Sequence, residues 1–198
     1  IAQCHCDAAV LRSEERKAIN RLLGRLSADR RKARTELAEA LTSPRYFQLL
    51  ERLDVAARAP ETVASNATVG LLVAAEFKKL RKAVRALPPD PTDDALHALR
   101  IEVKRVRYAA ELAEATVWKP ASRFLAQAKR FQTLLGNHQD AVVVEQRLRD
   151  LVAHATAGPV WFAVGMLVER QRARQQQVRE SFLTGWNKLN KRGRKAWL

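Results

Sequence analysis

The chain has 198 residues and a formal net charge of +15 at pH 7, from 36 Lys or Arg and 21 Asp or Glu residues. Because 47% of the residues are hydrophobic, the chain can bury a core and is not typical of a disordered protein. No run of 18 apolar residues occurs, which predicts that the chain has no membrane-spanning segment. Cys4 and Cys6 cannot build a disulfide framework, so we expect a reducing, cytoplasmic location.

The excess of positive charge indicates an anionic partner, because such a field repels itself unless a ligand neutralises it. From charge alone the candidates are a nucleic acid, an anionic membrane surface and a soluble polyanion. The plain alternative is a basic protein without an anionic ligand. The choice among them rests on how the cations are arranged on the predicted helices.

Strong helix formers dominate the sequence, and Pro and Gly residues mark the ends of the predicted helices. We predict helices over residues 16–41, 46–57, 61–86, 92–118, 121–135, 139–155 and 160–189. Thr92 caps the fourth helix, Gly136 separates the fifth from the sixth, and the end of the chain, NKLNKRGRKAWL (187–198), is predicted to be a mobile basic tail. No segment favours a strand, so the predicted fold class is all-α, a helical bundle.

A faint internal repeat divides the chain. The stretch CHCDAAV (4–10) matches NHQDAVV (137–143) at a His, an Asp, an Ala and a Val. Two predicted helices precede the second stretch, whereas the first stretch stands at the start of the sequence. We therefore expect a duplicated bundle whose first copy is incomplete. Residues 1–60 would be the remnant of the first bundle, and residues 61–198 the second bundle.

The stretch LHALRIEVKRVRY (96–108) combines an apolar face with a stripe of cations. At helical spacing, Arg100, Lys104 and Arg107 form one stripe beside the core face, with His97 and Tyr108 at its edge. Arg105 points elsewhere, and Glu111 is the one carboxylate on the stripe. Uncompensated Arg and Lys side chains suit a phosphate, because Arg offers forked hydrogen bonds and Lys a point charge. The alternative is a solvated basic edge with its aliphatic stems packed on the core.

Neighbouring helices carry further cations beside their apolar faces. Lys78, Arg81, Lys82 and Arg85 lie on one side of one helix, and Lys129 and Arg130 on another helix. Several such helices side by side would line a basic groove.

These motifs resemble the CHAD domain, the conserved-histidine α-helical domain. LHALRIEVKRVRYAAEL, then AKRFQTLLGNHQDAVVV and a late Trp186, carry the resemblance over residues 83–186, and the repeat extends it weakly over the rest. The resemblance implies paired helical bundles, basic surfaces and binding of inorganic polyphosphate, often beside a triphosphatase domain whose acidic strands do not occur here. The family's matching positions are His97, Arg100, Lys104, Arg105, Arg107, Tyr108, Lys129, Arg130 and Asp140.

Other chemistry is less well supported by the sequence. The stretch from Cys4 to Cys6, with His5 between them, would need further ligands to hold a metal, so no metal and no other cofactor is expected. Neither a G-x-S-x-G motif nor a P-loop occurs, and we expect no enzyme activity. Asp140 is expected to cap a helix or to pair with a nearby Arg.

The sequence therefore predicts non-catalytic binding of inorganic polyphosphate, or of a related polyanion, in a basic groove between helices, with no membrane partner and with association at polyphosphate granules. The alternatives are a nucleic-acid-binding helical protein and a regulatory domain for a triphosphatase partner. The predicted binding residues are His97, Arg100, Lys104, Arg105, Arg107, Tyr108, Lys129, Arg130, Lys78, Lys82 and Arg85.

Overall fold

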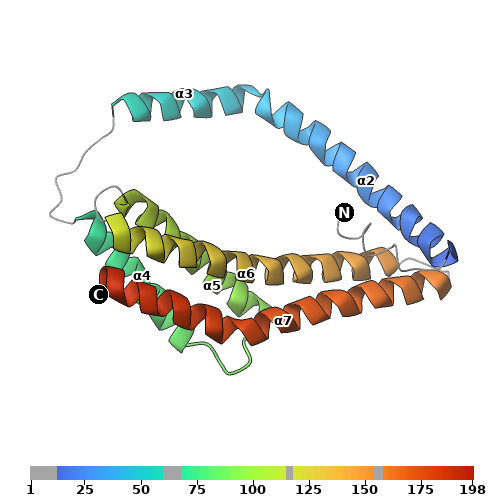
Figure 1. Cartoon of the computed structure of the whole chain (residues 1–198). Helices are drawn as coiled ribbons and strands as arrows, with labels where there is room; N and C mark the ends of the chain where they lie inside the picture. The colour runs from blue at the N-terminus through green and yellow to red at the C-terminus, as the bar shows by residue number, and fades with distance from the viewer. Residues whose placement is uncertain (1–12, 60–67, 115–117, 154–157) are drawn as a thin grey trace. The chain divides into compact units, whose positions relative to one another are not determined.

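The chain is all-α, as the sequence predicts. A computed structural model describes the chain except residues 1–12, 60–67, 115–117 and 154–157 (Figure 1). Every regular element in the described part is a helix. The helices are α2 (Ser13–Leu41), α3 (Pro44–Arg58), α4 (Val69–Arg85), α5 (Asp93–Ala113), α6 (Trp118–Val152) and α7 (Gly158–Trp197). Among these residues no helix is both long and apolar enough to cross a membrane.

The chain forms two compact units. The first comprises Ile1–Ser65 and Leu151–Leu167, and the second comprises Asn66–Asp150 and Val168–Leu198. Most of α6 and α7 therefore belongs to the second unit, together with α4 and α5. The proposed boundary between two bundles at residue 60 remains a prediction.

Short polar side chains begin the helices where the sequence places them. Thr92 precedes α5, and its hydroxyl accepts a hydrogen bond from the backbone N–H of Ala95 at 3.2 Å. Thr68 caps α4 in the same way. The residues before Thr68, which belong to the helix predicted over 61–86, lie outside the described residues. The predicted start of α5 is therefore confirmed.

Gly136 does not interrupt the chain, so the predicted separation at this residue is wrong. It lies inside α6, which runs without a break from Trp118 to Val152. A glycine in a helix interior costs only about 1 kcal/mol relative to alanine. Leu135 and Ala141 are buried on either side, and the packing of such residues outweighs that cost.

The predicted mobile tail is also wrong, because α7 continues to Trp197. Trp186, Leu189 and Trp197 are all buried in the core of the second unit. Together with the buried Gly193 they recur at helical spacing, so they form one apolar face. The basic residues between them had masked this face in the sequence.

Aromatic side chains join the helices of the second unit. The Phe124 ring of α6 packs edge-on against Phe77 of α4 at 5.6 Å and against Trp197 of α7 at 5.8 Å, measured between ring centroids. Phe131 of α6 lies 5.5 Å from Phe182 of α7. These contacts hold α4, α6 and α7 around one core, to which α5 adds its buried face.

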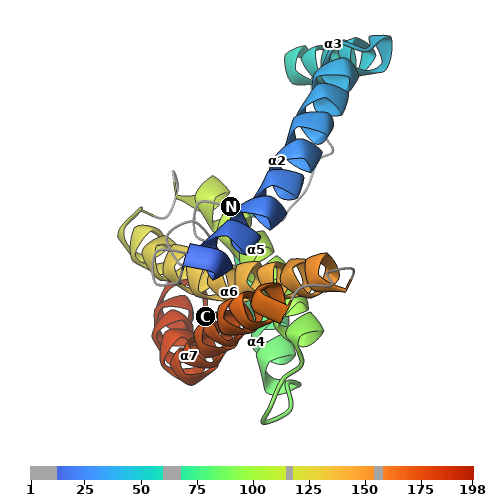
Figure 2. The same cartoon turned by 90° about the vertical axis from the view of Figure 1, so that its right-hand side faces the viewer.

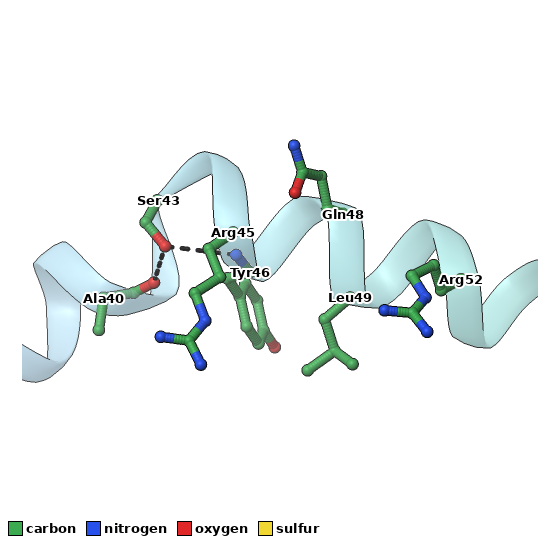
Figure 3. Close-up of a pocket in the computed structure, with 7 residues that line it drawn as sticks. All are labelled: Ala40, Ser43, Arg45, Tyr46, Gln48, Leu49 and Arg52. Atoms are coloured by element: carbon green, nitrogen blue, oxygen red, sulfur yellow. Dashed lines mark hydrogen bonds between the residues drawn. The ribbon is translucent and has the colours of Figure 1, made fainter.

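The first unit is open where α2 meets α3. Ser43 accepts a hydrogen bond from the Tyr46 backbone N–H and donates one to the Ala40 carbonyl oxygen, so it both ends α2 and caps α3 (Figure 3). A shallow pocket at this corner is lined by Ala40, Ser43, Arg45, Tyr46, Gln48, Leu49 and Arg52. α3 buries none of its residues, and Leu53 is 56% exposed.

Candidate anion-binding site

The cationic stripe of α5 lies at the border of the core. Leu96, Leu99, Val103, Val106 and Ala110 form the buried face of the helix, as predicted. His97, Arg100, Lys104 and Arg107 are half-buried beside it. The stripe is therefore partly withdrawn from water, unlike an ordinary solvated helix edge.

The stripe faces α6 across an antiparallel contact. The Nε of Arg100 would lie 3.7 Å from a Cβ at Gly136, and the Nζ of Lys129 lies 4.0 Å from the Oε1 of Glu111. Residue 100 of α5 thus lies opposite residue 136 of α6, and residue 111 of α5 lies opposite residue 129 of α6. We call the surface between the two helices the α5–α6 seam, made by His97, Arg100, Lys104 and Arg107 of α5 and by Lys129 and Gln132 of α6.

Buried polar atoms without a hydrogen-bond partner gather in this seam. In the described part of the chain, four of the seven such atoms belong to it: His97 Nδ1, Arg100 Nε, Arg107 Nε and Gln132 Oε1. Buried polar groups are nearly always satisfied in folded proteins, and an unsatisfied one calls for an explanation such as an ion or a ligand. Two of these atoms are guanidinium donors, which suit an anion.

Glu111 neutralises only one end of the stripe. The Nη1 of Arg107 donates to Glu111 Oε1 at 2.6 Å, and the Arg107 guanidinium lies 4.3 Å above the ring centroid of Tyr108. Arg100 and Lys104 make no ion pair with any described residue. The prediction that Glu111 is the carboxylate of the stripe is therefore confirmed.

The structure divides the other predicted residues among different surfaces. Arg105 donates to Glu102 at 2.7 Å and, with Lys82, lines a groove between α4 and α5. Arg130 lines a groove between α6 and α7, and Lys78 and Arg85 are exposed on α4. The predicted binding residues therefore do not share a single groove.

Two further sequence predictions concern Asp140 and the stretch from Cys4 to Cys6. Asp140 lies in the interior of α6, so its predicted capping role is wrong, and it has no ion pair with another described residue. Cys4, His5 and Cys6 lie outside the described residues. Within the described ranges, no three His, Cys, Asp or Glu side chains are grouped so that they could hold a metal ion.

A buried histidine lies beside the start of α5, which the sequence did not predict. The Nε2 of His138 lies 3.3 Å from Asp93 Oδ1, which also accepts a hydrogen bond from Arg179 Nη2 at 2.7 Å. Arg179 donates as well to Asp90 and to the Pro91 carbonyl oxygen. Burial lowers the pKa of His138, the charge of Asp93 raises it and that of Arg179 lowers it. The Nε2 of His138 makes no hydrogen bond itself, and the hydrogen bonds of Arg179 join α7 to the start of α5.

Glu145 makes a second connection between α6 and α7. It accepts hydrogen bonds from Arg149, Arg172 and Gln175 at 2.7 to 3.2 Å. Burial alone would raise the pKa of Glu145, but these hydrogen bonds outweigh burial and lower it. These hydrogen bonds hold the later part of α6 to α7.

The fold and the site define an all-α domain with a row of half-buried cations on α5, of which Arg100 and Lys104 make no ion pair with a described residue. The sequence profile of the CHAD domain matches residues 2–149, so the chain belongs to the CHAD domain family. The matched residues include CHCDAAV (4–10), the first copy of the faint internal repeat.

Two relatives come from Mycobacterium tuberculosis. They are "Uncharacterized protein MT2285" of strain CDC 1551 / Oshkosh and "Uncharacterized protein Rv2226" of strain ATCC 25618 / H37Rv. Each is 35% identical over 167 residues, which cover 79% of this chain. The chain spans 31% of the length of these relatives.

Proposed function

We propose that this domain binds inorganic polyphosphate along the α5–α6 seam, without catalysing a reaction. The observation that carries the proposal is the row of half-buried cations whose inner guanidinium nitrogens, on Arg100 and Arg107, have no partner. A phosphoryl oxygen would supply the missing acceptors. The binding would take place in the cytoplasm, at polyphosphate granules.

The spacing of the stripe suits an extended polyanion. Arg100, Lys104 and Arg107 span seven residues of helix, which is about 10 Å at 1.5 Å per residue. Several successive phosphoryl groups would lie along such a row. Arg100 and Arg107 would donate forked hydrogen bonds, and Lys104 would add a charge between them. Partial burial strengthens these interactions because less water competes for the cations.

The seam is better suited to a chain of phosphates than to RNA. Base recognition in single-stranded nucleic acids depends on exposed aromatic faces. Tyr108, at the edge of the stripe, is 49% exposed, but the Arg107 guanidinium covers one face of its ring. RNA binding is therefore the outcome that would argue against the proposal.

The relatives' greater length supports a second candidate. A domain that spans about a third of a longer protein could hold polyphosphate for a triphosphatase domain elsewhere in the same chain. In that case the seam would keep its binding role, and the reaction would belong to the other domain.

Calorimetric titration with long-chain polyphosphate, orthophosphate and RNA of equal total charge tests the proposal. We expect polyphosphate to bind most tightly and to weaken steeply with salt, as phosphate-directed binding does. Arg100→Ala with Lys104→Ala should lower its affinity about tenfold or more, because each change removes a hydrogen bond to a charged group. Arg30→Ala with Arg34→Ala, on the exposed surface of α2, removes the same charge and is the matched control.

Two results would contradict the proposal. RNA binding as tight as polyphosphate binding would favour a nucleic-acid-binding protein. An unchanged polyphosphate affinity in the folded seam variant would show that the α5–α6 seam is not the site.

A further inference from the structure

Two segments of the second unit that lie away from the α5–α6 seam are also rich in positive charge. Residues 77–87 of α4 and its end contain five Lys or Arg and no Asp or Glu. Residues 181–198 of α7 and its end also contain five Lys or Arg and no Asp or Glu. Of these cations Lys79 pairs with Glu76, and none of the others makes an ion pair with a described residue. Lys79 and Lys82 line the groove between α4 and α5, and Lys188 lines the groove between α6 and α7, so these three lie outside the surface between α4 and α7.

The two basic segments lie against each other. Gly193 of α7 sits so close to Phe77 of α4 that a Cβ at 193 would overlap the ring, with Cε1 at 2.7 Å. One turn further along α4, burial lowers the pKa of Arg81, and the positive charges of Arg85 and Arg194 lower it further. Arg81 and Arg85 of α4 and Arg194 of α7 thus crowd one surface, which we call the α4–α7 strip, and the exposed cations Lys191, Arg192 and Lys195 lie on the same last turns of α7.

The α4–α7 strip and the α5–α6 seam lie on opposite sides of the second unit. α4 packs against α5, and α5 faces α6 at Arg100 and Gly136. α6 meets α7 at Phe131 and Gly185, and α7 meets α4 at Gly193 and Phe77. Four helices that contact in this order form a ring, in which the pair α5 and α6 lies opposite the pair α4 and α7 (Figure 2). With helices about 10 Å apart, the two surfaces are about 20 Å apart.

A single phosphate chain that lies along one seam cannot neutralise the opposite strip without passing around the bundle. The strip also differs from the seam in its ion pairs, because Glu111 offsets part of the charge of the seam whereas Arg81, Arg85 and Arg194 make no ion pair with a described residue. Repulsion among these cations favours any extended anion that lies between α4 and α7. The α4–α7 strip therefore has unpaired positive charge that suits an anion, and it faces away from the α5–α6 seam.

We propose that the α4–α7 strip is a second phosphate-polyanion surface, and that the domain bridges two polyphosphate chains. The proposal rests on the proposed function, since it takes the ligand class from the seam. A protein with two such faces links polyphosphate chains into a network, as bivalent binders do. Excess polyphosphate would dissolve the network, because each face would then hold a separate chain.

Light scattering during a titration of the whole protein with long-chain polyphosphate tests the bridging. Wild-type protein should scatter most near charge balance and less in excess polyphosphate. Arg81→Gln with Arg85→Gln and Arg194→Gln should lower the maximum about fivefold or more, because one of two binding faces is lost. Lys191→Gln with Arg192→Gln and Lys195→Gln changes only exposed side chains and should act in the same direction if the first variant does not fold.

Arg30→Gln with Arg31→Gln and Arg34→Gln, on α2, removes three charges outside both surfaces and should scatter as wild type does. Calorimetry with tripolyphosphate should give two sites for this control and one for either strip variant. If both strip variants scatter like wild type and keep two sites, the strip is not a binding surface. If wild-type protein binds polyphosphate at one site without scattering, the bridging fails and the proposed function stands. If it binds no polyphosphate, the proposed function itself fails.

Discussion

Replacing Gly193 by alanine tests the docking of the last turns of α7 on α4. The new Cβ would overlap the Phe77 ring, which is fully buried and packs edge-on against Phe124. Overpacking of this kind costs about 1–3 kcal/mol. The higher helix propensity of alanine returns about 1 kcal/mol. Because Phe77 has no exposed space to move into, we expect a net destabilisation of about 1–2 kcal/mol.

Urea unfolding followed by tryptophan fluorescence measures this change, since Trp186 and Trp197 are both buried in the same core. Gly165→Ala is the matched control, because Gly165 also lies within α7 and a Cβ there has nothing within 4 Å. The control should gain up to about 1 kcal/mol. Equal or greater stability of Gly193→Ala relative to wild type would refute the docking of α7, and with it the α4–α7 strip.

Three further predictions concern α6. Gly136→Ala should stabilise the protein by up to about 1 kcal/mol in urea unfolding, because α6 is continuous there and the new Cβ meets Arg100 Nε at an ordinary 3.7 Å; a loss of stability would contradict this packing. Burial lowers the pKa of His138 below 6.5, so the unfolded chain binds more protons than the folded one below that pH. Stability should therefore fall between about pH 7 and the lowered pKa, by at most about 1.4 kcal/mol per pH unit, and His138→Gln should flatten the fall; an unchanged slope would refute the assignment. Glu145→Gln should cost about 1 kcal/mol near neutral pH, because it weakens hydrogen bonds to charged partners in a partly solvated network. The loss should shrink as acid protonates Glu145 in the wild-type protein, and a pH-independent difference would count against its lowered pKa.

The helix of the cationic stripe could be predicted in detail from the sequence. Its cap, its buried face and the position of Glu111 depend on residues within a few turns of one another. Such local periodicity fixes which side chains share a face before any partner is known. The all-α fold follows from the same local signals and is confirmed.

The predictions that were wrong concern residues whose structure depends on a contact with a distant part of the chain. From the sequence alone, Gly193 and its basic neighbours predict a mobile tail. In the fold, Phe77, more than a hundred residues earlier in the chain, provides the surface on which Gly193 packs. The contact of Arg179 with Asp93 links residues 86 positions apart, and no local pattern marks it. The sequence therefore indicated which cations lie beside apolar helix faces, but it could not assign them to separate surfaces.

The clustered cations Arg81, Arg85 and Arg194 link the folding of the second unit to its ionic surroundings. Repulsion among these cations opposes the docking of α7, and any anion that screens them favours the docked state. An anion that binds only the folded chain adds RT ln(1 + [L]/Kd) to its stability. If the α4–α7 strip binds polyphosphate, the protein should therefore be more stable with polyphosphate than in dilute salt without it.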